Sequence, residues 1–318
     1  MKIKAANISI LVGLMLSCSC LAVSADSSAG SSTDTFLDKN ARFHPVISEL
    51  GLVVSQEAIA SQVGADILEA GGNAIDAAVA TGFALAVTLP RAGNLGGGGF
   101  MMVYLAKENK TIAIDYREMA PLSADRDMFL DSKGDVDNEK ARFSAQSSGV
   151  PGTVAGLLHA LEQYGTLSIS EVLKPAVKLA SQGFKVNHDL ADSLRLGSKR
   201  LYQHAASKHY FYKPEGEYYL PGELFVQSDL GSTLKRISDK GTFGFYKGNT
   251  AELIVAQMQR SGGLITLDDL ASYKVVEREP VCGSYRQYSL CAMPPPSSGG
   301  IHLIQMLNIL ENFDLKKM

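Results

Sequence analysis

The chain has 318 residues, of which 46% are hydrophobic and 20% are charged, and its formal net charge is −3 at pH 7. This apolar content is typical of a globular protein and excludes a largely disordered chain. The slightly acidic balance, without a basic run, gives no electrostatic reason to expect a nucleic-acid partner.

Residues 1–25 have the pattern of a cleaved secretory signal peptide. Lys2 and Lys4 form a positive start, an apolar run covers 8–16, and small residues precede a cut before Asp26. We therefore expect a periplasmic or secreted protein that is free of the membrane once the signal has been removed.

Two alternatives for this segment remain open. An uncleaved membrane anchor is disfavoured because the apolar run is shorter than the roughly 20 residues that a spanning helix needs. A lipoprotein cut at Cys18 or Cys20 would need a Leu-small-small-Cys box, and no good one precedes either cysteine. After the signal we expect a flexible tether over 26–40, whose first part is rich in Ser and Gly, and one folded domain over 41–318.

The first elements of the domain are predicted from hydrophobic periodicity. Apolar residues recur at helical spacing over 58–68, with Ser55 as the expected N-cap. The next helix, 74–87, is almost wholly apolar, which is typical of a helix buried on all sides. Two strands are expected over 100–105 and 111–116, joined by a short polar turn.

Blocks of helices follow these strands, and this arrangement favours an α+β fold over a strict βα alternation. Further helices are expected over 151–164, 169–183, 188–213, 232–240, 250–262, 266–273 and 301–312. The last of these carries so many apolar residues that it must be covered on more than one side. Because only a short, mostly polar segment follows it, we expect the chain to be a truncated part of a larger domain.

Cys282 and Cys291 are the two cysteines that remain after signal removal, and they lie in a predicted hairpin. A two-residue turn at Arg286-Gln287 places them opposite each other as a non-hydrogen-bonded pair, whose side chains are close. An exported protein meets oxidising conditions, so we expect a disulfide. The alternative is two free thiols in another register, because Arg-Gln is not a favoured turn pair.

Gly96–Gly99 form a run of four glycines directly before the first strand. The run lacks the Gly-x-x-x-x-Gly-Lys-Ser/Thr pattern and precedes a strand, so a phosphate-binding loop is disfavoured. Two interpretations remain open: a tight bend that requires positive φ, or a loop that contacts a ligand closely.

Arg117 follows the second predicted strand, beside Asp115 and Glu118. One interpretation is a solvated charge cluster at a strand end. The other is an arginine that grips a carboxylate through two hydrogen bonds, oriented and supported by the neighbouring acids. The six histidines show no metal-ligand spacing, so no metal site is expected.

Six stretches of the chain, in order, resemble bacterial γ-glutamyltranspeptidases. They are Ser55-Gln56-Glu57-Ala58, Gly71–Ala78, Gly93–Phe100, Asp115–Pro121, Val150–Gly156 and Pro294–Gly300. The resemblance implies an N-terminal-nucleophile hydrolase, an αββα sandwich that is incomplete in this chain, with no metal or organic cofactor. It also implies a precursor that cuts itself into a large and a small subunit.

The family's new N-terminal Thr attacks the γ-glutamyl amide of glutathione or another γ-glutamyl compound, and the acyl group passes to water or an amino acid. The resemblance assigns Arg117 to the α-carboxylate of that group. The chain contains no Thr-Thr pair, and the nucleophile would lie beyond Met318. We therefore expect no catalytic residue here and no activity without the small subunit or the C-terminal remainder.

Three alternatives stay open at this point: one half of a split enzyme, a non-catalytic exported γ-glutamyl-binding or partner subunit, and a related acylase. The intact motif around Arg117 disfavours the acylase. Cys282 and Cys291 are not part of the family's pattern, so their disulfide would be a local feature.

Overall fold

The computed structural model describes residues 47–315 and 317–318. The predicted signal peptide over 1–25 and tether over 26–40 lie outside the described residues, as does the predicted domain start at residue 41. One compact unit covers Glu49–Met318. Within the described residues, no helix has the length and apolar content of a membrane span.

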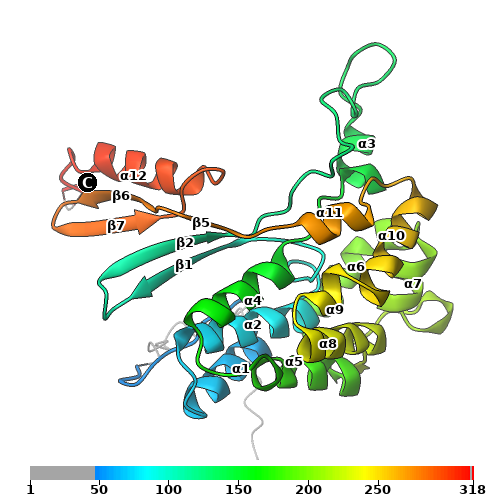
Figure 1. Ribbon diagram of the computed structural model, residues 1–318, viewed down its shortest axis with the longest axis horizontal. Helices are drawn as coiled ribbons and strands as arrows, with labels where there is room; N and C mark the ends of the chain where they lie inside the picture. The colour runs from blue at the N-terminus through cyan, green and yellow to red at the C-terminus, as the bar shows by residue number, and fades with distance from the viewer. Residues whose placement is uncertain (1–46, 316) are drawn as a thin grey trace, which may run out of the picture. The chain divides into compact units, whose positions relative to one another are not determined.

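Most of the unit is helical (Figure 1). The α-helices are α1 (Ala58–Glu69), α2 (Ala74–Thr88), α3 (Asn138–Phe143), α4 (Thr153–Tyr164), α5 (Ile169–Gln182), α6 (His188–Leu201), α7 (Ala205–Phe211), α8 (Ser228–Lys240), α9 (Phe243–Tyr246), α10 (Asn249–Ser261), α11 (Leu267–Ser272) and α12 (Gly299–Leu310). Short 3₁₀ turns lie at Ala145–Ser147 and Pro214–Gly216.

Helix α2 is the centre of the hydrophobic core, as its composition predicts. Ten of its residues are buried, and α1, α4 and α5 pack around it. Asn73 and Asp76 form a capping box at its start: the Asn73 side chain accepts the N–H groups of Ile75 and Asp76, and the Asp76 carboxylate accepts the N–H of Asn73. The predicted cap of α1 is wrong: Glu57 accepts the N–H of Ala60, while the Ser55 hydroxyl donates to the carbonyl of Glu57.

The main sheet is antiparallel, in the order β1 (Phe100–Leu105), β2 (Lys110–Asp115) and β5 (Val276–Arg278). The first two strands agree with the prediction to within one residue, and β5 was not expected. The remaining strands form two small two-stranded antiparallel sheets. They are β3 (Phe184–Lys185) with β4 (Leu224–Phe225), and β6 (Val281–Tyr285) with β7 (Tyr288–Ala292).

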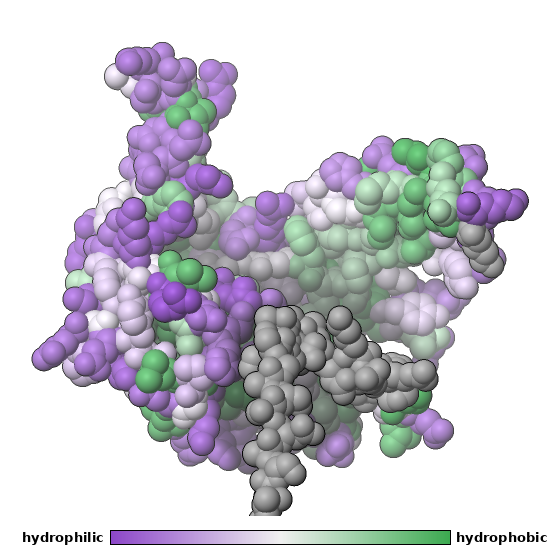
Figure 2. Space-filling model, turned by 180° about the vertical axis from the view of Figure 1, so that it is seen from behind, coloured by the Kyte–Doolittle hydropathy of each residue, from purple (hydrophilic) through white to green (hydrophobic). Residues whose placement is uncertain are grey.

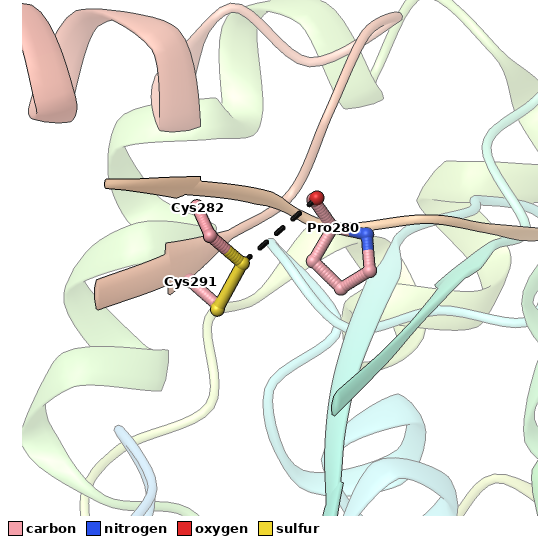
Figure 3. Close-up of a disulfide and its surroundings, with 3 residues drawn as sticks. All are labelled: Pro280, Cys282 and Cys291. Atoms are coloured by element: carbon pink, nitrogen blue, oxygen red, sulfur yellow. Dashed lines mark hydrogen bonds between the residues drawn. A yellow bond between two sulfur atoms is a disulfide. The ribbon is translucent and has the colours of Figure 1, made fainter. Parts of the chain in front are cut away.

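The β6–β7 hairpin confirms both its predicted register and its disulfide. Cys282 pairs directly with Cys291, their Cα atoms are 4.1 Å apart, and their sulfurs are bonded (Figure 3). Arg286 accommodates the tight turn by taking a φ of 53°. Helix α12 packs on this hairpin, and Gly283 lies against Ile304.

The helix predicted over 188–213 is divided into α6 and α7. The ring of Tyr202 packs edge-on against Tyr212, with centroids 4.6 Å apart, and its hydroxyl donates to the carbonyl of Gly216. The backbone is extended at His204, so α6 ends before Tyr202 and α7 begins at Ala205.

Candidate functional site

The glycine run and the segment that carries Arg117 are in direct contact. Gly99 and Tyr116 exchange two backbone hydrogen bonds of 3.2 and 3.0 Å, which extend the β1–β2 ladder. A Cβ atom on Gly98 would lie 2.6 Å from the carbonyl oxygen of Tyr116. None of Gly96–Gly99 has positive φ, so the expectation of a positive-φ bend is wrong. At Gly98 and Gly99 the missing side chain instead allows the close approach of residues 116–118.

Both backbone polar groups of Arg117 are held by side chains. Its N–H donates to Asp115 Oδ1 at 3.1 Å, and its carbonyl accepts the hydroxyl of Tyr273 at 2.9 Å. Burial, reinforced by the nearby charges of Asp115 and Glu118, raises the pKa of Tyr273. The phenol therefore stays protonated and remains a donor. The guanidinium is exposed, and its Nη1 lies 3.5 Å from the carbonyl of Pro296.

Asp115 is buried at the end of β2 and has a second partner. Its Oδ2 accepts a hydrogen bond from Arg278 Nε at 2.8 Å. One carboxylate thus joins a guanidinium on β5 to the backbone of Arg117. Charge-assisted bonds of this kind are stronger and shorter than neutral ones.

These residues border an open cavity of about 330 Å³. The predicted site residues Asp115, Arg117 and Glu118 all line it, so the structure brings them together. Sequence reasoning missed the rest of the lining, which consists of Met119, Tyr273, Lys274, Val276, Arg278 and Pro296. A buried aspartate predicts that a cationic side chain pairs with it, but the sequence does not show which cation this is.

The cavity combines three cationic side chains, Arg117, Lys274 and Arg278, with the two carboxylates Asp115 and Glu118. Arg117 presents a planar fork that matches a carboxylate. Among the described residues that line it, none is a serine, threonine or cysteine. The described part of the chain also holds no group of three His, Cys, Asp or Glu side chains placed for a metal ion.

Comparison with known proteins gives consistent matches. The gamma-glutamyltranspeptidase family model matches residues 60–318. The glutathione hydrolase proenzyme of Escherichia coli (strain K12) is 56% identical over 276 residues, which cover 86% of this chain and 47% of the relative. At lower identity, 38% over 277 residues, the acylase ACY 1 proenzyme of Pseudomonas sp. (strain V22) matches 85% of this chain and 49% of the relative. The chain thus spans about half the length of the curated relatives it matches.

Solved structures agree with the sequence matches. The crystal structure of Helicobacter pylori γ-glutamyltranspeptidase has a TM-score of 0.84 at 48% identity, covering 86% of this chain and 78% of that chain. Its fold is that of the N-terminal-nucleophile hydrolases, which confirms the predicted α+β class. The chain belongs to the γ-glutamyltranspeptidase family.

Proposed function

We propose that this chain forms the γ-glutamyl-binding part of a γ-glutamyltranspeptidase, or glutathione hydrolase, and that Arg117 anchors the α-carboxylate of the donor. The observation that carries the proposal is the fixed position of Arg117. Side chains hold its N–H and its carbonyl, and its guanidinium faces an open cavity. A fork-shaped cation on a rigid backbone can bind a carboxylate bidentately with little loss of entropy.

The neighbouring acids have supporting roles in this proposal. Asp115 fixes the backbone of Arg117 through the hydrogen bond to its N–H. Glu118 is exposed in the same cavity, where its charge favours the α-ammonium group of a γ-glutamyl donor. A donor held at both charged groups presents its γ-amide at a set distance from Arg117, and this positioning is the contribution of the present residues to catalysis.

The chemical step requires a nucleophile that the family draws from its small subunit. We propose that a Thr hydroxyl attacks the γ-amide carbonyl and releases the amine. Water or an amino acid then attacks the resulting γ-glutamyl ester, takes the γ-glutamyl group and releases the Thr hydroxyl. Glutathione and other γ-glutamyl compounds are the proposed donors. The proposed partner is the small subunit or C-terminal remainder, and the proposed location is the periplasm or the exterior of the cell.

The match to an acylase proenzyme favours one second candidate, an amide hydrolase that acts on a different acyl group. The two candidates differ at Arg117. A γ-glutamyl enzyme needs a cation for the α-carboxylate, and an acylase for an uncharged acyl group does not.

The test uses the full-length protein that contains this chain, with a γ-glutamyl anilide as donor. For Arg117→Lys we expect the donor KM to rise about ten- to hundredfold, because a bidentate charged contact becomes a single point charge. Arg126→Lys is the matched control, since Arg126 is exposed and forms an ion pair with its neighbour Asp127. An Arg117→Lys enzyme with wild-type KM would contradict the proposal.

A further inference from the structure

Arg278 lies on β5, in a different part of the sequence from the motif that carries Arg117. Strand register pairs Arg278 with Ala113 and Val276 with Asp115. Arg278 and Asp115 are therefore diagonal neighbours on one face of the sheet, within reach of a long side chain. The 2.8 Å bond from Arg278 Nε to Asp115 Oδ2 spans this diagonal.

The two carboxylate oxygens of Asp115 accept hydrogen bonds from different groups. Oδ2 receives Arg278, and Oδ1 receives the backbone N–H of Arg117 at 3.1 Å. The Asp115 side chain is only 9% exposed, whereas that of Arg278 is 36% exposed. Within the described part of the chain, Arg278 is the cation in ion-pair contact with this carboxylate. A buried carboxylate that loses its cation is left as an uncompensated charge, and this weakens the arrangement that depends on it.

We propose that Arg278 is a positioning residue for donor binding: it fixes Asp115, which in turn fixes the backbone of Arg117. This inference rests on the proposed function, because its consequence for the enzyme is the affinity for γ-glutamyl donors. Arg278 also lines the cavity, so a direct contact with the donor is the competing explanation.

The expected kinetic signature follows from the chemistry of the anchored group. The α-carboxylate does not react, so its contact with Arg117 is the same in the bound donor and in the transition state. Weakening such a contact raises KM and leaves kcat nearly unchanged. A residue that only stabilised the fold would instead lower the melting temperature or the active fraction without changing KM.

The experiment compares Arg278→Met, Arg278→Lys and the control Arg126→Met in the full-length protein. For Arg278→Met we expect the donor KM to rise roughly tenfold with kcat within about twofold of wild type. Lysine keeps one charged donor, so Arg278→Lys should recover most of the loss. A thermal melt of each variant separates folding from binding.

A double-variant comparison separates positioning from direct contact. If Arg278 acts through the carboxylate contact of Arg117, then adding Arg278→Met to Arg117→Met, which has no cation left to position, should raise KM by less than about twofold further. Full additivity of the two effects would overturn the positioning role, and so would an unchanged KM in Arg278→Met.

Amide hydrogen exchange at Arg117 distinguishes failure of this inference from failure of the proposed function. If the wild-type protein does not turn over γ-glutamyl anilide, the proposed function fails. The structural link, by which Arg278 fixes the Arg117 backbone through Asp115, can still be tested by hydrogen exchange. Faster exchange of the Arg117 amide in Arg278→Met than in Arg126→Met would support the link, and equal exchange would overturn it.

Discussion

Two regions of this molecule hold their strands in place by different means. In the core region, residues 49–278, strand β2 is buried from Ile112 to Asp115 against a helical layer. In the hairpin–helix, residues 281–310, only Met293 and Gly300 are buried. Its strands are joined by a disulfide, and apolar side chains of α12 gather at the surface, with Ile309 61% and Met306 55% exposed (Figure 2).

The comparison shows where rigidity at the candidate site originates. Arg117 and Asp115 belong to the core region. Asp115 is buried, and the backbone of the exposed Arg117 is held by hydrogen bonds to Asp115 and from Tyr273. Pro296, whose carbonyl lies near the Arg117 guanidinium, belongs to the hairpin–helix. One side of the cavity is therefore formed by the core region, and the other by the disulfide-linked hairpin–helix. We therefore expect substitutions in the core region to lower the stability of the folded unit, and substitutions in the hairpin–helix to act locally.

The largest effect is expected from overpacking the core region. A Cβ on Gly156 would overlap the ring of Tyr116, which is itself next to Arg117. For Gly156→Ala we expect a loss of about 3 kcal/mol in unfolding free energy, measured by denaturant titration. The helix propensity gained, ~1 kcal/mol, is smaller than this loss.

Gly96→Ala is the control for that substitution. Gly96 is exposed, and the nearest atom to its added Cβ is Asn94 Oδ1 at 3.5 Å. A change within about 0.5 kcal/mol is expected there. Equal effects at Gly96 and Gly156 would show that the core region tolerates added volume near Tyr116, and that tight packing does not fix the backbone there.

A smaller and more local effect is expected when the disulfide is removed. Cys282 and Cys291 are separated by 9 in sequence, and closing a loop of that length restricts the unfolded chain by about 2.5 kcal/mol. For Cys282→Ser/Cys291→Ser we expect faster amide exchange in β6 and β7. Amides of β1 and β2 are the internal control, and acceleration there to the same extent would show that the two regions unfold as one.

The smallest of the three effects is the contribution of Asp76 to the stability of the core region, which depends on pH. Asp76 is buried at the start of α2. Burial alone would raise its pKa, but hydrogen bonds from Thr166, Asn73 and Leu167 outweigh burial, and the pKa lies below its ordinary value of 3.8. The stabilisation is therefore fully present at neutral pH. It is lost as the pH falls below about 4 and through the folded-state pKa.

For Asp76→Asn we expect a loss of about 2 kcal/mol at pH 7, because an amide cannot accept all of these bonds. The difference between the variant and the wild type should shrink as the pH falls toward 2, as followed by denaturant titration across pH. A loss that stays the same at every pH would contradict the assignment to the Asp76 carboxylate.

Much of the fold could be predicted from the sequence because its signals are local. Periodicity predicted α1 and α2, and the spacing of Cys282 and Cys291 around a two-residue turn predicted the hairpin register. Strand β5 could not be found this way, since three residues after a short helix show no alternation. The two-residue strands β3 and β4 are shorter still.

The candidate site was predicted in part for the same reason. Arg117 and its acidic neighbours are adjacent in sequence, so their grouping was visible. Arg278 is 163 residues from Asp115, and the sequence offers 30 lysines and arginines as partners for that aspartate. Only the register of β5 on β2 selects one of them.

If Arg117 anchors the donor, it must distinguish donors that carry an α-carboxylate from donors that lack one. We would measure kcat/KM of the full-length protein for γ-glutamyl anilide and for its neutral α-carboxamide analogue, in the wild type and in Arg117→Met. We predict a preference of roughly hundredfold for the carboxylate in the wild type, and the loss of most of it in the variant. An equal preference in both proteins would show that another group binds the carboxylate.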